Sequence, residues 1–258
     1  MLEIKNICAG YSGESVLRDI SLAIPRGSVT VIVGPNGCGK STLLKALAGI
    51  LPATGSVMLD GQELLTLPGR ERAKKVAFLP QSRQIPEITV RNLVLHGRFP
   101  YLSYPRRYRQ SDEKIAEEAM TQMGIGELAG RKLTTLSGGQ RQKAYIAMAL
   151  AQDTPVVLLD EPNTFLDIAH QLQLMNHVRA LAAAGKTVVT VLHDLPLAME
   201  WADYLAVLSE GECLFHGSPE EAFHSESLCG AFGVQLQRVE TLDGWKYYFS
   251  ARKTEKIK

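Results

Sequence analysis

The sequence predicts an α/β fold with a mixed sheet, an antiparallel β portion at the N-terminus and an α-helical subdomain inserted in the α/β core. Three observations predict it. A nearly all-β-branched run, Val29 to Val33, precedes a glycine-rich loop and an apolar helix. Strands and helices alternate from residue 156 onward, which is typical of a helix-covered parallel sheet. Between about residues 90 and 150 the chain has helical patterns and no β-rich run.

The first third of the chain is predicted to be mainly strands. Leu2, Ile4 and Ile7 are apolar with polar residues between them, and residues 16–24 form a second such run. The run of residues 29–33 is apolar on both faces, as expected of a strand buried in the middle of a sheet. An apolar helix is expected over residues 40–48.

The second half of the chain supplies the rest of the core. We expect buried strands at residues 156–160, 187–192 and 204–208. A helix is predicted over residues 168–184, where Gly185 ends it. Strand–helix–strand order of this kind places neighbouring strands parallel.

Two amphipathic helices, residues 112–123 and 138–150, mark the insertion. At the C-terminus, residues 234–240 and 245–250 flank Asp243-Gly244, a dipeptide that favours a tight hairpin turn. Residues 252–258 are expected to form a charged, frayed tail. We therefore divide the chain into residues 1–233, the main domain, and residues 234–258, the hairpin and tail.

The composition argues against a nucleic-acid-binding, secreted or membrane-spanning protein. The 258 residues carry a formal net charge of +1, so no global charge draws the chain to nucleic acid or to an acidic membrane. The N-terminus lacks the apolar region of a signal peptide, and no apolar run approaches the ~18 residues that cross a bilayer. The four cysteines form no CxxC pair, which favours a reducing compartment over a zinc or disulfide site.

A phosphate-binding loop follows the buried strand at residues 29–33. The segment that starts at Gly34 matches GxxxxGK[ST] at every fixed position. Glycines let the backbone N–H groups turn inward onto phosphate oxygens, and the following helix adds its positive end. We expect Lys40 to reach the β- and γ-phosphates and Ser41 to hold Mg²⁺. The predicted nucleotide-binding residues of this loop are Gly34, Pro35, Asn36, Gly37, Cys38, Gly39, Lys40, Ser41 and Thr42.

An acidic pair ends the buried strand at residues 156–160. Asp160 is expected to bind Mg²⁺, directly or through water, and Glu161 to orient or deprotonate an attacking water. Carboxylates that merely end a strand in solvent are the alternative. The phosphate-binding loop on a neighbouring strand favours the first interpretation and predicts a P-loop NTPase core.

The string Leu136-Ser137-Gly138-Gly139-Gln140 resembles the signature of the ABC-type ATPases. In that family the signature contacts the γ-phosphate of ATP held by the other subunit. Ser137 is a good N-cap, and the helix that follows presents N–H groups to an anion. The resemblance thus implies that Ser137, Gly138, Gly139 and Gln140 bind nucleotide, and that a second copy of the chain completes the site.

The same resemblance assigns roles to residues along nearly the whole chain. Tyr11 would stack on adenine, Gln81 would touch Mg²⁺ or water, and Asp167 would line the subunit interface. His193 would hydrogen-bond the γ-phosphate and hold Glu161 in line. Asn163 stands where the family often has Thr, a mild departure. The implied catalytic set is Glu161, His193, Gln81 and Lys40, and the implied metal set is Ser41, Gln81 and Asp160.

The segment from Arg91 to Arg109 mixes basic and aromatic residues, with five arginines and three tyrosines. Such a run can bind nucleic acid, or it can be a solvated loop. The segment from Leu95 to Tyr101 also resembles the ATPases of importers for iron–siderophore, haem and cobalamin, where this region faces the permease. The neutral charge balance of the chain favours the permease over nucleic acid.

Together these residues predict the ATP-binding and ATP-hydrolysing subunit of an ABC importer. Its cofactors would be ATP and Mg²⁺. Its partners would be a second copy of itself, permease subunits and, indirectly, a substrate-binding protein, with no nucleic acid. It would lie on the cytoplasmic face of the cell membrane. An ABC exporter, or a soluble ABC ATPase acting on nucleic acid or ribosomes, is the alternative. The single P-loop and the insertion of about 60 residues count against the soluble ATPase. The lack of a fused transmembrane region and the importer resemblance of residues 97–101 count against the exporter.

Overall fold

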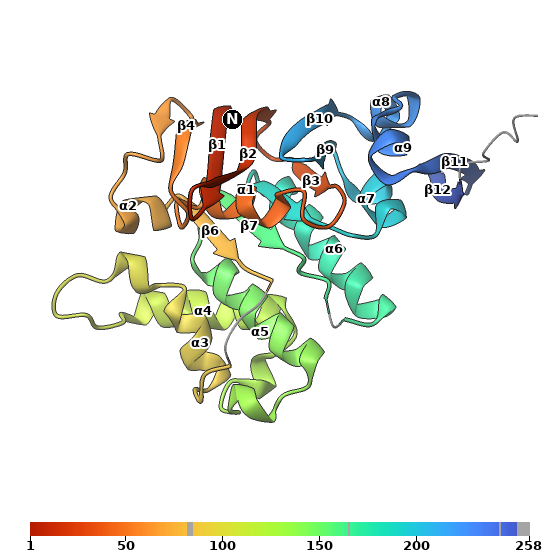
Figure 1. Ribbon diagram of the computed structural model, residues 1–258. Coiled ribbons are helices and arrows are strands. Elements are labelled where there is room, and N and C mark those ends of the chain that lie inside the picture. Colours follow the sequence, from red (N-terminus) through yellow and green to blue (C-terminus); the bar gives the residue numbers. More distant parts are fainter. Residues whose placement is uncertain (82–84, 165, 243, 252–258) are drawn as a thin grey trace, which may run out of the picture.

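The fold was obtained as a computed structural model, which describes residues 1–81, 85–164, 166–242 and 244–251 (Figure 1). Asp243 of the expected turn, the expected tail at residues 252–258 and Phe165 lie outside the described residues. Three sheets are present in the described part, with six, four and two strands. The mixed α/β class predicted from the sequence is confirmed.

The six-stranded sheet forms the centre of the molecule. Its order is β10 (Glu212–Gly217), β9 (Tyr204–Ser209), β3 (Val29–Val33), β8 (Thr187–Val191), β7 (Val156–Asp160) and β6 (Val76–Leu79). All neighbours are parallel except β10, which runs antiparallel to β9. β3, β7 and β8 are buried along their whole length, as their apolar sequences predict.

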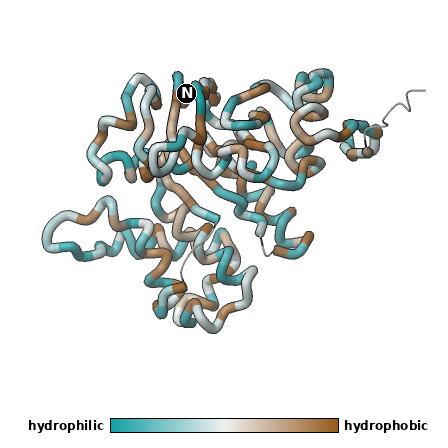
Figure 2. Tube along the Cα trace, in the orientation of Figure 1, coloured by the Kyte–Doolittle hydropathy of each residue, from teal (hydrophilic) through white to brown (hydrophobic). Residues whose placement is uncertain are grey.

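An antiparallel sheet forms the N-terminal portion, as expected. Its order is β2 (Glu14–Ile24), β1 (Leu2–Tyr11), β4 (Ala53–Leu59) and β5 (Gln62–Glu63). Helix α1 (Lys40–Leu47) packs between this sheet and one face of the six-stranded sheet, with Leu43, Leu44 and Leu47 buried in a shared core. Figure 2 shows hydrophobic stretches running along these central strands.

The opposite face of the large sheet packs on α6 (Ile168–Ala183) and α7 (Leu195–Trp201). The same hydrophobic cluster continues into the inserted helices α3 (Val90–His96), α4 (Gln110–Gln122) and α5 (Gly138–Ala151). Short 3-10 turns connect them: η1 (Phe99–Tyr101), η2 (Gly126–Leu128) and η3 (Leu133–Thr135). Figure 1 shows this helical subdomain set off from the sheets, so the predicted insertion is confirmed.

The C-terminal segment contains α8 (Pro219–His224), α9 (Ser227–Phe232) and the hairpin β11 (Val234–Thr241) and β12 (Gly244–Ala251). Lys246 of the hairpin pairs with Glu200 of α7 at 2.5 Å. The guanidinium of Arg238 lies 4.1 Å from the ring centres of both Phe223 and Trp245. These contacts fasten the hairpin to the main domain, and the division at residue 233 stays a prediction.

The structure contains elements that were not predicted from the sequence. They are β4, β5, α2 (Gly69–Ala73), α3, β10, α8 and α9. Most are short or exposed, so they lack a readable period. In β4, Gly55 interrupts the pattern because its φ of 97° and its approach to the backbone of Asn6 suit only glycine. In the described part, no helix combines the length and apolar character that a bilayer crossing needs.

Candidate functional site

The phosphate-binding loop joins β3 to α1, as the sequence predicts. Gly39 is the N-cap of α1 with a φ of 105°, and a Cβ there would lie 2.6 Å from a methyl group of Leu17. Only glycine suits both constraints. The Nζ of Lys40 donates to the carbonyl oxygens of Gly34 and Pro35, at 2.7 and 2.8 Å. The lysine is therefore held inside the loop it is expected to serve.

Asp160 lies at the end of β7, directly beside this loop. The hydroxyl of Ser41 donates to its Oδ1 at 3.0 Å. Burial raises the pKa of the Asp160 carboxyl, while the Ser41 hydrogen bond opposes the rise and the nearby Glu161 adds to it. A hydroxyl and a carboxylate side by side are the oxygen ligands that Mg²⁺ prefers.

Glu161 is the next residue and is held from two sides. Its Oε2 accepts a hydrogen bond from the Gln81 side chain at 2.5 Å, and its Oε1 lies 2.5 Å from Nε2 of His193. These three residues follow β6, β7 and β8, whose parallel order brings their carboxyl ends to one edge of the sheet. Ligands bind at this edge in sheets of this type.

Most of these residues line one hollow of about 390 Å³; the expected residues Gly34, Pro35, Cys38 and Asp160 are not among its lining, and Asp160 reaches it through Ser41. Its walls are Asn36, Gly37, Gly39, Lys40, Ser41, Thr42, Gln81, Glu161 and His193. The structure thus brings together the expected loop, catalytic and metal residues from four distant segments. Tyr11 is not among these lining residues; its exposed ring lies 5.7 Å from the Nζ of Lys45 on α1, so its role on adenine stays a prediction.

Three of the signature residues, Ser137, Gly139 and Gln140, line a second hollow of about 250 Å³ together with Asp167, whereas Gly138 is not among its lining residues. Ser137 caps α5: its hydroxyl accepts from the Gln140 N–H, and the Gln140 side chain accepts from the Ser137 N–H. Asp167 caps α6 from one side only: its Oδ1 accepts from the His170 N–H and lies 2.8 Å from the His170 ring. This hollow holds no P-loop residue.

Two further residues of this second hollow were missed from the sequence. Lys143 and His170 line it, each one helical turn beyond an expected residue. Helical spacing could have found them, because residues three or four apart share a face.

The basic and aromatic run of residues 91–109 separates into two parts. Arg98 is buried and forms an ion pair with Asp112 at 3.1 Å, so it stabilises the subdomain instead of binding a partner. Tyr101 donates to the carbonyl oxygen of Gln152 at 2.9 Å. Phe99 and Tyr104, in contrast, are exposed, and Tyr104 is almost fully so, at 97%.

Comparison with known proteins agrees with this arrangement. Residues 17–164 match the family model described as ABC transporter. The ferric enterobactin transport ATP-binding protein FepC of Escherichia coli K12 is 41% identical over 239 residues, which cover 92% of this chain and 88% of that protein.

Solved structures give the same result. The inward-facing structure of a putative metal-chelate type ABC transporter has a TM-score of 0.83 and 28% identity, with 96% of each chain covered. A dimeric bacterial ABC transporter cassette has a TM-score of 0.75 and 30% identity, with 85% of this chain and 99% of that chain covered.

The fold and the P-loop hollow define an ATPase of the P-loop class. Within that class, the chain belongs to the ABC transporter family.

Proposed function

We propose that this chain is the subunit that binds and hydrolyses ATP to power an ABC importer, with an iron–siderophore, haem or cobalamin-type chelate as the cargo of the assembled transporter. The position of Glu161, held between Gln81 and His193 beside the phosphate-binding loop, carries the proposal. The cargo class is supported by the relatives' names, which specify ferric enterobactin and a metal chelate.

Mg²⁺ fits the residues present. No cluster of three or more acidic, histidine or cysteine side chains that could hold a metal exists among the described residues. Mg²⁺ needs no such cluster, since it takes one or two protein oxygens and completes its shell with phosphates and water. Ser41 and Asp160 would hold it, with Gln81 adjacent, and it would neutralise charge on the β- and γ-phosphates.

Three side chains, those of Lys40, Glu161 and His193, would carry out hydrolysis. Lys40 leaves the loop carbonyl oxygens to pair with the β- and γ-phosphates. Glu161 accepts a hydrogen bond and then the proton from the attacking water. The water oxygen bonds to the γ-phosphorus in line as the bond from that phosphorus to the β-phosphate oxygen breaks. His193 holds the Glu161 carboxylate through Nε2, and when ATP binds this nitrogen turns from the carboxylate to donate to the γ-phosphate.

The signature hollow supports a head-to-tail pair of chains. Each chain has a P-loop hollow and a separate hollow that is lined by Ser137 and Gly139. In the proposed dimer, Ser137 and Gly139 of one copy contact the γ-phosphate bound by the other copy. ATP then stabilises the closed dimer because its contacts are complete only in that state. Hydrolysis removes these contacts, and the dimer opens.

The permease would hold this chain at the cytoplasmic face of the membrane. The exposed Phe99 and Tyr104 lie on a loop that also carries Arg106 and Arg107. We propose that this loop faces the cytoplasmic segments of the permease. Pull-down of the tagged chain from detergent-solubilised membranes should recover a polytopic partner in similar amount; recovery of ribosomes or DNA alone would contradict transport.

Glu161→Gln tests the catalytic proposal directly. The amide keeps the shape of the side chain but cannot accept a proton, so we expect ATP binding without turnover. Light scattering should show a dimer that persists with Mg²⁺ and ATP, whereas the unmodified chain returns to monomers as ATP is consumed. A variant that stays monomeric at saturating ATP, or that turns over normally, would refute the proposed mechanism.

A further inference from the structure

Gln142 connects α5, the helix that begins at the signature, to the loop that follows β7 and carries Glu161. It lies on the second turn of α5, is 7% exposed, and its Nε2 donates to the backbone carbonyl oxygen of Pro162 at 2.5 Å. A carbonyl oxygen can only accept, so the NH₂ end of the amide must face it. Pro162 has no N–H, and it directly follows Glu161.

The backbone at Glu161 needs such support. Its φ is 49°, in the left-handed region that side chains other than glycine rarely adopt. A conformation of this kind persists only where surrounding contacts determine it. The contacts with Gln81 and His193 hold the carboxylate. The Thr164 N–H donates to the Glu161 carbonyl oxygen at 3.3 Å, and the Gln142 side chain holds the next carbonyl group along the chain, that of Pro162.

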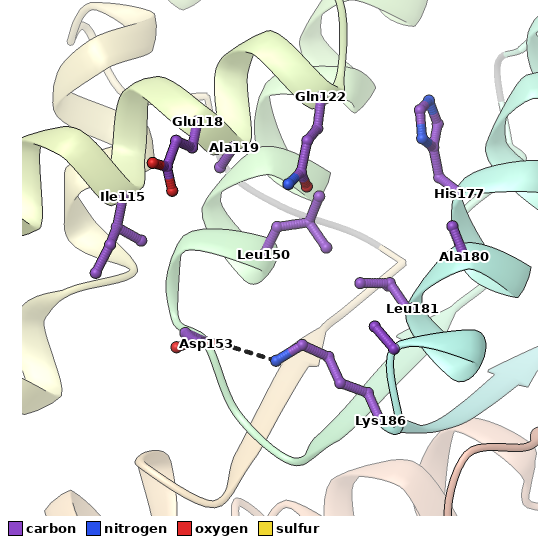
Figure 3. Close-up of a pocket in the computed structure, with 11 residues that line it drawn as sticks. Ile115, Glu118, Ala119, Gln122, Leu150, Asp153, His177, Ala180, Leu181 and Lys186 are labelled. Carbon is purple, nitrogen blue, oxygen red and sulfur yellow. Dashed lines mark hydrogen bonds and ion pairs between the residues drawn. The ribbon is translucent and has the colours of Figure 1, made fainter.

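The packing around α5 makes this helix the connection between subdomain and core. A cleft of about 400 Å³ lies between α4 and α6, lined by Ile115 and Ala119 on one side and by His177 and Leu181 on the other (Figure 3). α5, in contrast, reaches the core at both ends, through Gln142 and through Gln152. α5 is therefore a continuous helix that joins the signature residues at its start to the loop after β7, through the Gln142 hydrogen bond.

We propose that Gln142 is a positioning residue, which couples the signature end of α5 to the placement of Glu161 in the same chain. The inference rests on the proposed function, since it assumes that Glu161 acts on the attacking water. Binding of a second copy's γ-phosphate at Ser137 and Gly139 would fix α5. The Gln142 bond would then hold Glu161 in its catalytic position.

Gln142→Met tests the role, because methionine has a similar length and no donor. We expect kcat of the full chain to fall by about tenfold, while KM and ATP binding change little. The reason is that displacing a catalytic group by 1 Å can lower the rate by up to about 10²-fold. Gln152→Met is the matched control: it removes bonds from the same helix to the carbonyl oxygens of Ala73 and Val76. It should leave kcat nearly unchanged. Equal kcat in the two variants, or a rise in KM alone, would overturn the proposal.

Gln142→Glu adds a readout that a purely structural role would not move. A protonated carboxyl can donate to the Pro162 carbonyl oxygen, and an ionised one cannot. Turnover relative to the unmodified chain should therefore rise as pH falls; a flat ratio would overturn the proposal. Glu161→Gln is measured in parallel to separate the two proposals. A fully active Glu161→Gln variant would refute the proposed function itself. An inactive Glu161→Gln variant together with a fully active Gln142→Met variant would refute only this inference.

Discussion

Nε2 of His193 lies 2.5 Å from Oε1 of Glu161, although the two residues follow different strands of the sheet. We predict that His193→Ala lowers kcat by about 10²-fold or more, the cost of removing one donor from a charge-stabilising site. ATP binding should be largely retained. Phosphate release and nucleotide titration measure the two effects. His224→Ala is the control, because it breaks a similar contact with Glu220, at 3.0 Å on exposed α8; equal losses in both variants would contradict the prediction.

Arg98→Met should destabilise the helical subdomain. Arg98 and Asp112 are both buried, at 9% and 8% side-chain exposure, and removing one partner leaves a buried charge unpaired. Such losses cost about 3–5 kcal/mol of unfolding free energy. Arg98→Met with Asp112→Asn should recover much of it, because asparagine is neutral and still accepts from the Arg109 N–H as a cap. Urea unfolding measures both, and a double variant no more stable than the single one would refute the account.

Gly97→Ala should loosen the packing of α3 on α5. A Cβ at this position would lie 2.3 Å from the backbone oxygen of Met148, which cannot move without shifting α5. Overpacking of this kind costs about 1–3 kcal/mol, so the melting temperature should fall. Gly130→Ala is the control, with nothing within 4 Å of its added Cβ, and should change little. Similar melting temperatures for the two variants would show that α5 tolerates the added methyl.

His216 should make the protein sensitive to acid. Its ring stacks on Tyr204, and within the described residues its buried Nε2 has no hydrogen-bond partner. Burial lowers the pKa of His216 from its ordinary value of 6.5, and Glu221 opposes the shift. The unfolded chain therefore takes up a proton before the folded one does, so this group's contribution is complete above pH 6.5 and is lost as pH falls toward the folded pKa.

His216→Phe keeps the stacking and removes the titration. The drop in melting temperature between neutral and mildly acidic pH should be smaller for this variant than for the unmodified chain. Equal drops would assign the acid sensitivity to other groups, such as His177, whose pKa burial also lowers.

Much of the site was predictable because its residues carry local signals. The glycines of residues 34–39 lie between a buried strand and a helix, and the Asp-Glu pair ends a second buried strand; this context is typical of phosphate binding. The structure brings both to one edge of the sheet. The expectation that the two motifs follow neighbouring strands was wrong, because β8 lies between β3 and β7 in the sheet. Strand order depends on long-range pairing, which the local sequence does not reveal. The sequence indicated that these residues would meet, but it did not indicate the contact of Gln81 with Glu161.

What could not be predicted depends on tertiary contacts of ordinary residues. Gln142 looks like any glutamine on an amphipathic helix, and only packing reveals that its amide faces a carbonyl oxygen. Arg98 stood among exposed-looking arginines, yet it is buried beside Asp112. The Ser218-to-Glu221 capping box of α8 was a readable local signal, but no helix was predicted there.

The separation of the two hollows has a genetic consequence. If each ATP is held between the P-loop of one copy and the signature of another, an inactive copy damages the sites it shares with intact copies. An allele that inactivates Glu161, expressed beside the normal allele, should therefore be dominant. The fractional loss of uptake should exceed the fraction of subunits that carry the defect.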